Sequence, residues 1–202
     1  MDSISADIVI LPSPAISALA IKVSSGLHQF GTLSVLEEGK IFPHASLYMC
    51  QLKTADLPKV ESILTGIAAR HSLKILEAAE YAQENRYIDI EYMRIQDLDQ
   101  LQEQVLEFIN PVRDGLRPQD EARLKTAKGQ DLENLKKYGY RGVGEAFRPH
   151  LTLARFVLEQ ELDTSTLPQV SEFSGSFTHL GLFEMGPNGT CVRRIATFAL
   201  QG

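Results

Sequence analysis

The chain has 202 residues, of which 44% are hydrophobic and 23% charged, and its formal net charge is −6. This balance is typical of a globular protein and excludes a disordered or low-complexity chain. The negative charge argues against a protein that binds long nucleic acid, because neutralising many backbone phosphates requires a basic face. A small substrate with one or two phosphates remains compatible with a local positive site.

The N-terminal residues are not expected to form a secretory signal, and the cysteines are not expected to form a disulfide framework. Residues 1–6 are polar and lack the basic region of a secretory signal, and the apolar run at 8–11 is too short to span a bilayer. The two cysteines, Cys50 and Cys191, lie in apolar, strand-like contexts without Cys-x-x-Cys spacing. We therefore expect free, buried thiols in a cytoplasmic protein that does not bind membranes.

The first half of the chain alternates strands and helices. An apolar strand over 7–11 ends at Pro12, and apolar residues at helical spacing predict a helix over 15–27. A polar turn at 37–40 leads into a strand that ends near Leu52. The segment 57–68 carries an apolar stripe and predicts a second helix.

The second half begins with strands predicted over 73–81 and 86–93, and a helix follows over 97–109. The segment 114–139 is rich in charged residues and is expected to be helical. A strand is predicted over 147–156. The chain ends in a hairpin of 173–185 and 191–200, whose Pro187-Asn188-Gly189 connection has the expected turn chemistry.

A short motif occurs twice, each time on a predicted strand and directly after a proline. The copies are Pro43-His44-Ala45-Ser46-Leu47 and Pro149-His150-Leu151-Thr152-Leu153. Residues two apart on a strand face the same way, so each histidine shares a face with its hydroxyl residue. A single copy would carry little information, but two matched copies indicate a shared chemical role.

This pair of motifs resembles those of the two-histidine (2H) phosphoesterases, which include the LigT-like 2′,5′ RNA ligases and the RNA 2′,3′-cyclic phosphodiesterases. The resemblance implies an α+β fold of two similar lobes, with small antiparallel sheets and flanking helices related by a pseudo-twofold axis. One motif from each lobe would line a central cleft. The order of strand, helix and motif strand occurs in both halves of the chain, which agrees with such a duplication.

We expect one bilobal domain over 1–202, in which the charged stretch 114–139 is an insertion. The second repeat is longer than the first by about the length of this stretch. Two interpretations of the insertion remain open. It is either a solvated helix without a chemical role, which we favour, or a flap over the cleft.

Paired histidines can break a phosphodiester bond without a metal or another cofactor. The reaction needs a base for the attacking oxygen, an acid for the leaving oxygen and donors to the phosphoryl oxygens. We assign the first two roles to His44 and His150 and the third to Ser46 and Thr152. The symmetry of the repeat leaves open which histidine is the base. A metal site is disfavoured because neither motif has His-x-His or His-x-x-x-His spacing.

Strand alternation ranks the neighbouring residues. Phe42 and Tyr48 fall on the face of His44 and are candidates for stacking on a nucleobase, although strand aromatics more often belong to the core. Arg148 falls on the face of His150 and is the preferred phosphate clamp. Arg155 falls on the opposite face, where a structural role is expected.

The expected activity is hydrolysis of 2′,3′-cyclic phosphates, with 2′,5′ ligation as the reverse reaction. Substrate candidates are RNA ends, cyclic nucleotides, 2′,5′-linked oligonucleotides and the cyclic phosphate of ADP-ribose, and the acidic charge favours the small ones. The protein is expected to act as a monomer. The alternative is a non-catalytic module that binds a nucleotide or phosphometabolite. Structural roles are assigned to the other histidines, His28, His71 and His179.

Overall fold

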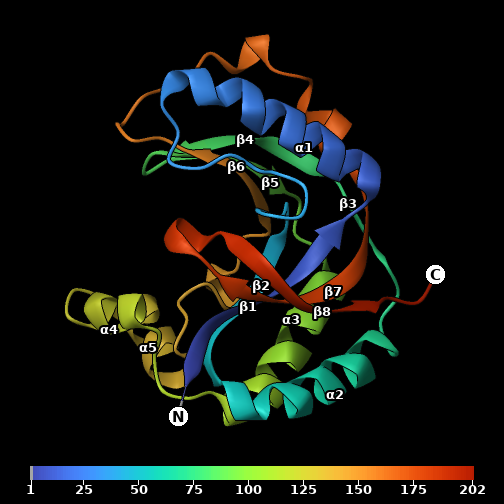
Figure 1. Ribbon diagram of the computed structural model, residues 1–202, viewed down its shortest axis with the longest axis vertical. Coiled ribbons are helices and arrows are strands. Elements are labelled where there is room, and N and C mark those ends of the chain that lie inside the picture. The colour runs from blue at the N-terminus through green and yellow to red at the C-terminus, as the bar shows by residue number, and fades with distance from the viewer. Residues whose placement is uncertain (1) are drawn as a thin grey trace.

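The computed structural model describes residues 2–202, which form eight strands and five α-helices (Figure 1). The strands are β1 Ser3–Pro12, β2 Ala45–Lys53, β3 Lys74–Leu76, β4 Ala78–Glu84, β5 Tyr87–Tyr92, β6 His150–Arg155, β7 Gly175–Met185 and β8 Cys191–Ala199. The helices are α1 Pro14–Leu27, α2 Leu57–Ala68, α3 Gln96–Ile109, α4 Pro118–Leu124 and α5 Gly129–Tyr138. Each helix in this part of the chain is too short or too polar to cross a membrane.

The strands form one antiparallel sheet that consists of two halves. Its order is β3-β7-β1-β2-β6-β5-β4, and β8 pairs with β7 outside this path. The halves meet where β2 lies beside β6, and the register there contains a single pair, Ala45 opposite Leu151. Continuing this antiparallel register by one residue sets His44 opposite Thr152 and Ser46 opposite His150. The two motifs therefore lie side by side about the centre of the sheet.

Both motif strands contain a β-bulge at the same position. Along β2 the pairing with β1 passes from Ser46 to Tyr48 and skips Leu47. Along β6 the pairing with β5 passes from Thr152 to Ala154 and skips Leu153. A bulge places two residues opposite one and breaks the alternation of side chains between the faces. The matched bulges support the duplication that the sequence predicts.

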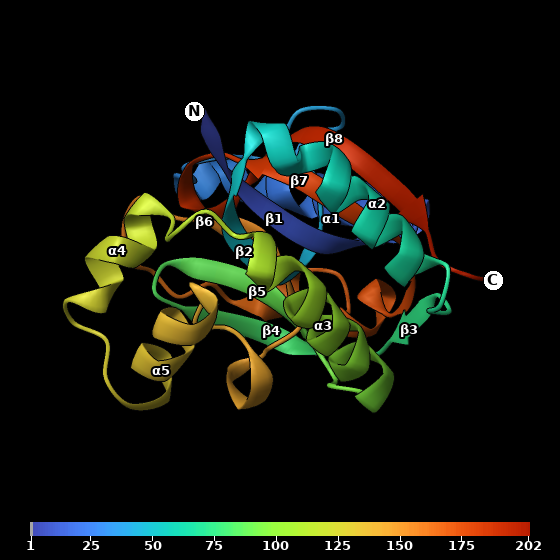
Figure 2. The same ribbon diagram turned by 90° about the horizontal axis from the view of Figure 1, so that it is seen from below.

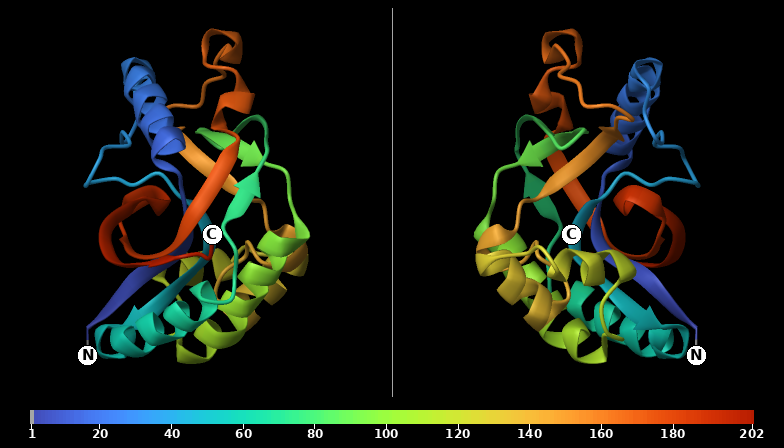
Figure 3. Two further views of the ribbon diagram at one scale, coloured as in Figure 1. Left: turned by 90° about the vertical axis from the view of Figure 1, so that its right-hand side faces the viewer. Right: turned by 90° about the vertical axis from the view of Figure 1, so that its left-hand side faces the viewer.

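The helices cover the two halves of the sheet (Figures 1 and 2). Helix α1 follows β1 but packs against β6 of the other half, whereas α3 follows β5 but packs against β2. Helix α2 packs against α3, β7 and β8. The short helices α4 and α5 contact each other and lie to one side of the body, which the right-hand view of Figure 3 faces. Each of α1 and α3 thus links the two halves.

The predicted α+β, duplicated and bilobal architecture is confirmed, and the insertion is helical as expected. One expected element is wrong, because the strand predicted over 73–81 is two strands. β3 pairs with β7 in one half of the sheet, whereas β4 pairs with β5 in the other. The chain crosses between the halves at Glu77, which lies between the end of β3 and the start of β4.

Two glycines are expected to respond to alanine in opposite ways. A Cβ at Gly181 of β7 would meet the ring of Phe183 and lie 3.0 Å from Cγ2 of Val9, and both neighbours are fully buried. Gly181→Ala should therefore destabilise the fold by about 1–3 kcal/mol. Gly26 lies in α1 with nothing within 4 Å of its Cβ position. Gly26→Ala should stabilise the fold by about 0.5–1 kcal/mol.

Urea unfolding of both glycine variants measures these changes in the free energy of unfolding. Equal unfolding midpoints for Gly181→Ala and the wild type would show that the β1–β7 pairing has more room than the structure indicates.

Candidate active site

The two motifs open into a cleft of about 970 Å³. Its floor carries His44, Ser46, His150 and Thr152. Its walls are the β4–β5 turn, the β7–β8 turn and residues from the insertion and the segment after it. The structure therefore brings together all four residues that the sequence assigns to catalysis.

The two histidines are held in the same way. Nδ1 of His44 lies 2.7 Å from the carbonyl oxygen of Phe42, and Nδ1 of His150 lies 2.7 Å from the carbonyl oxygen of Arg148. A carbonyl only accepts hydrogen bonds, so in both rings Nδ1 carries the proton and donates it. The neutral rings therefore keep the lone pair of Nε2, the nitrogen that can accept or deliver a proton.

The bulges change which side chains face the cleft. Beyond Leu47 and Leu153 the alternation is reversed, so that Met49 and Arg155 line the cleft with the histidines. The prediction that Arg155 lies on the opposite face is therefore wrong. Its guanidinium lies over the ring of Tyr87, 4.9 Å from the centroid, and donates to the Asn188 side chain of the β7–β8 turn.

The two aromatic residues considered as candidates for stacking on a base do not line the cleft. Tyr48 is fully buried, and its hydroxyl donates to the carbonyl oxygen of Tyr138 at 2.6 Å. Phe42 packs on Phe183 with ring centroids 5.0 Å apart, and Arg194 covers it at 4.9 Å. The cause for Tyr48 is the bulge at Leu47, which turns the following side chain into the core.

Arg148 does lie at the cleft, as predicted. Its guanidinium is 3.3 Å from the carboxylates of Glu84 and of Glu91. These contacts fix its direction and compete with any anion that it would bind.

A buried carboxyl group lies beside the first motif and was missed from the sequence. Asp7 of β1 is fully buried and accepts a hydrogen bond from the Ser46 hydroxyl at 2.7 Å. Its Oδ2 is 3.6 Å from Nε2 of His44, while its Oδ1 has no partner within residues 2–202. The sequence signal was a charged residue at the start of an otherwise apolar strand.

Burial is the main cause of the shifted pKa values of Asp7 and His44. It raises the pKa of Asp7 to about 7, although the Ser46 hydrogen bond and the nearby Arg117 act in the opposite direction. It lowers the pKa of His44 to about 4, partly offset by the hydrogen bond to Phe42. The nearby His150 lowers it further. The low-dielectric surroundings thus favour the uncharged forms of both groups.

The second motif has a different neighbourhood, with residues of β5 that the sequence did not assign to the site. Asp89 lies opposite Thr152, lines the cleft and has a buried Oδ1 without a partner in the described chain. Tyr87 lies opposite Arg155 and also lines the cleft. The alternation of this strand predicted one exposed face, but only the pairing with β6 shows that this face belongs to the cleft.

The insertion is mostly exposed to solvent, and some of its residues also line the cleft. Gln119 and Arg123 come from α4, Asp131 comes from α5, and Arg141 follows α5. Arg117 holds this segment in place. It is fully buried, and its Nε lies 2.6 Å from Oδ2 of Asp120. Its guanidinium carbon lies 5.7 Å from the centroid of the Tyr140 ring. This position is compatible with a flap over the cleft, while the favoured interpretation, a solvated helix without a chemical role, stays a prediction.

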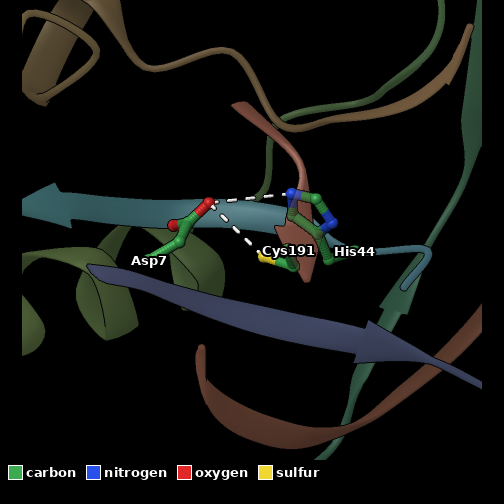
Figure 4. Close-up of side chains that lie close together, drawn as sticks. All are labelled: Asp7, His44 and Cys191. Atoms are coloured by element: carbon green, nitrogen blue, oxygen red, sulfur yellow. Dashed lines mark hydrogen bonds and ion pairs between the residues drawn. The ribbon is translucent and has the colours of Figure 1, made fainter. Parts of the chain in front are cut away.

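One group of side chains has the donor types of a metal site. Asp7, His44 and Cys191 each offer one ligand atom, and these atoms lie within 4.8 Å of one another (Figure 4). Sγ of Cys191 is 3.9 Å from Oδ2 of Asp7. Burial raises the pKa of the Cys191 thiol well above its ordinary value.

The architecture and the paired motifs define the fold of the 2H phosphoesterases. The structure superposes on E. coli LigT in complex with phosphate with a TM-score of 0.61, at 15% identity and over the whole of both chains. TT0787 of Thermus thermophilus gives a TM-score of 0.61 at 15% identity over 98% of each chain. A phosphoesterase gives 0.55 at 15% identity over both whole chains. The resemblance predicted from the motifs is thus confirmed at the level of the fold.

Residues 51–180 match the family model described as a protein of unknown function (DUF1045), and the chain belongs to this family. No curated protein matches the chain. The family description carries no activity, so any functional assignment depends on the site.

Proposed function

We propose that the protein is a phosphodiesterase that hydrolyses 2′,3′-cyclic phosphates of nucleotides or short RNA ends by paired-histidine acid/base catalysis. The observation that carries the proposal is the matched pair of imidazoles. His44 and His150 donate Nδ1–H to a carbonyl at the same distance, and both line one cleft beside a hydroxyl residue. A binding site alone has no need for two equally oriented acid/base groups.

In the proposed reaction one histidine takes a proton from water as the water oxygen attacks phosphorus. The bond from phosphorus to one ribose oxygen breaks, and the other histidine gives its proton to that oxygen. The product is a phosphomonoester with a free neighbouring hydroxyl. If the 5′ hydroxyl of a second chain attacks in place of water, the same two proton transfers break the bond from phosphorus to O3′ and join the chains by a 2′,5′ linkage.

The nature of the cleft supports a phosphorylated substrate. Arg86, Arg123, Arg141, Arg148 and Arg155 line it, although the chain as a whole is acidic. A guanidinium matches the geometry of phosphate oxygens and strengthens hydrogen bonds through its charge. The similar LigT has been crystallised with phosphate and with 3′-AMP, and those ligands belong to the chemical class proposed here.

The proposal is tested by hydrolysis of the four nucleoside 2′,3′-cyclic monophosphates in the presence of a chelator. We expect turnover of at least one of them, which also reports the base preference. Tight binding of these nucleotides without turnover, here and on linear and 2′,5′-linked diesters, would contradict the proposal and favour a binding module.

The two motif hydroxyls are expected to differ in their roles. The Thr152 hydroxyl lines the cleft and has no hydrogen bond to another group of residues 2–202, whereas Ser46 donates to Asp7. Thr152→Val should lower kcat by about 10²–10³-fold, the usual cost of losing a donor to the developing charge. Ser46→Ala should lower kcat less.

The same pair is expected to show the opposite order in stability. Ser46→Ala leaves the buried Asp7 carboxyl without its donor, which costs about 1–3 kcal/mol. Steady-state kinetics and urea unfolding of both variants test this crossed pattern. If Ser46→Ala had the larger effect on kcat and the smaller effect on stability, the assignment would be reversed.

A further inference from the structure

The group formed by Asp7, His44 and Cys191 joins three separate parts of the chain. Asp7 comes from β1, His44 directly precedes β2, and Cys191 begins β8. The backbone N–H of Phe42 donates to the carbonyl oxygen of Cys191 at 3.1 Å, which fixes the last two segments to each other. The side chains point toward one another from these strands (Figure 4). The arrangement is therefore built by the fold and does not depend on a mobile loop.

Two of the three distances between the donor atoms are close to those of a tetrahedral metal site. Bonds of about 2.0–2.3 Å at tetrahedral angles separate neighbouring donors by roughly 3.3–3.6 Å. Here Oδ2 of Asp7 is 3.6 Å from Nε2 of His44 and 3.9 Å from Sγ of Cys191. The third pair, Nε2 of His44 and Sγ of Cys191, lies within 4.8 Å, so a bound ion would draw these two side chains together by up to about 1.2 Å.

The donor set selects the kind of ion. Imidazole and thiolate suit zinc and similar divalent transition metals, whereas magnesium and calcium prefer sites made of oxygen alone. The thiol and the carboxyl would each release a proton and become anionic ligands for the dication. The ion would bind Oδ2 of Asp7, the oxygen that also accepts from Ser46, and would balance the charge of this buried carboxylate.

The buried charge nearest to this group does not exclude a cation. Arg117 is the positive charge that acts on the Asp7 carboxyl, and it is itself paired with Asp120 at 2.6 Å. Of the three residues, His44 lines the cleft with an 11% exposed side chain, whereas Asp7 and Cys191 are fully buried, so an ion would have to pass the His44 ring. The fourth coordination position would then face the cleft.

We propose that Asp7, His44 and Cys191 form a binding site for a zinc-like divalent transition-metal ion, and that its occupation inhibits the enzyme. The binding itself stands on the three side chains alone, while the inhibition rests on the proposed function. A bound ion occupies the lone pair of Nε2 that His44 needs for proton transfer. The catalytic state is the metal-free state, and the ion acts as a reversible inhibitor.

Cobalt(II) absorption tests the binding without reference to activity. Titration of the full chain with cobalt should produce a near-ultraviolet thiolate-to-cobalt charge-transfer band and the visible bands of a four-coordinate ion. Cys191→Ala should abolish the charge-transfer band. Cys50→Ala is the matched control, because Cys50 is the other free, buried cysteine and should leave the band unchanged.

A second variant guards against a folding defect in Cys191→Ala. Asp7→Asn has nearly the same shape and retains the thiol, so the charge-transfer band should persist. The cobalt concentration at half-saturation should rise by at least about 10-fold. This is the lower end of the loss in metal affinity when a residue that supports a metal ligand is replaced. No thiolate band in the wild type, or the same band in Cys191→Ala, would overturn the site.

Zinc titration of the hydrolysis reaction tests the inhibition. Zinc should inhibit the wild type and Cys50→Ala and should lose its effect in Cys191→Ala, with each rate taken relative to the same protein in chelator. A cobalt-thiolate band together with full activity in zinc would overturn the inhibitory role. If the protein hydrolyses none of the substrates, the proposed function fails, while the cobalt spectrum still decides the site.

Discussion

Replacing either His44 or His150 by alanine is expected to lower kcat for 2′,3′-cyclic nucleotide hydrolysis by about 10²–10⁴-fold, the usual contribution of a positioned acid or base. Both imidazoles line the same cleft, and in each the Nδ1 lies 2.7 Å from a carbonyl oxygen that fixes the ring. A fixed ring on one side of the phosphate therefore cannot take over proton transfer on the other side. The double variant should be little slower than either single one, because the two groups act in one step.

His28→Ala serves as the matched control for these variants. The His28 side chain is exposed, and its Nδ1 lies 3.0 Å from the hydroxyl oxygen of Thr32. His28 is not among the residues that line the cleft. The rates should be measured in chelator, so that a bound metal ion does not mask the acid/base pair. Turnover by either motif variant at the rate of His28→Ala would exclude a two-histidine mechanism.

Replacing Arg117 by methionine is expected to destabilise the fold by about 3–5 kcal/mol, because it leaves a buried carboxylate without its closest partner. Arg117 and Asp120 are both fully buried and lie 2.6 Å apart. Only the partly exposed Arg123, at 2.9 Å, would remain beside Asp120. The loss should also loosen the insertion, since Arg117 joins α4 to the ring of Tyr140.

The double variant Arg117→Met/Asp120→Leu should recover most of the lost stability, because buried ion pairs and apolar pairs of similar volume are often equivalent. Arg193→Met is the control. Arg193 lies 2.6 Å from Glu184 in an exposed pair, which contributes about 0–1 kcal/mol. Urea unfolding measures all three, and a cost for Arg117→Met no larger than that for Arg193→Met would contradict a structural role of the buried pair.

The two motifs and their shared cleft could be predicted from the sequence because the motifs are short, local and repeated. His44 with Ser46, and His150 with Thr152, required only the rule that alternate strand residues share a face. Most helices and strands were likewise found from the period of their apolar residues, with boundaries that differ by a few residues.

The neighbours of the motifs could not be predicted by the same rule. The bulges at Leu47 and Leu153 reverse the alternation, so Arg155 faces the cleft and Tyr48 enters the core. Each motif ends in a leucine that is followed by another buried residue, Leu47-Tyr48 and Leu153-Ala154, but a strand covered on both faces has the same sequence pattern as a bulged one.

Residues contributed by other strands were invisible for a different reason. Asp7 and Asp89 reach the site only because β1 lies beside β2 and β5 beside β6. Periodicity shows that a strand has a polar side chain, but it does not show which strand lies next to it. The alignment of the two halves was inferred from the repeat, whereas the pairing within each half came from the structure.

The single residue pair between β2 and β6 has a mechanical consequence. With so little strand pairing at the junction, the angle between the halves of the sheet is set by α1, which packs on β6, and by α3, which packs on β2. A small rotation about Ala45 and Leu151 would change the separation of the two imidazoles and leave the pairing within each half intact. The size of phosphodiester that the cleft admits should therefore respond to packing changes beneath α1 and α3, far from the reacting atoms.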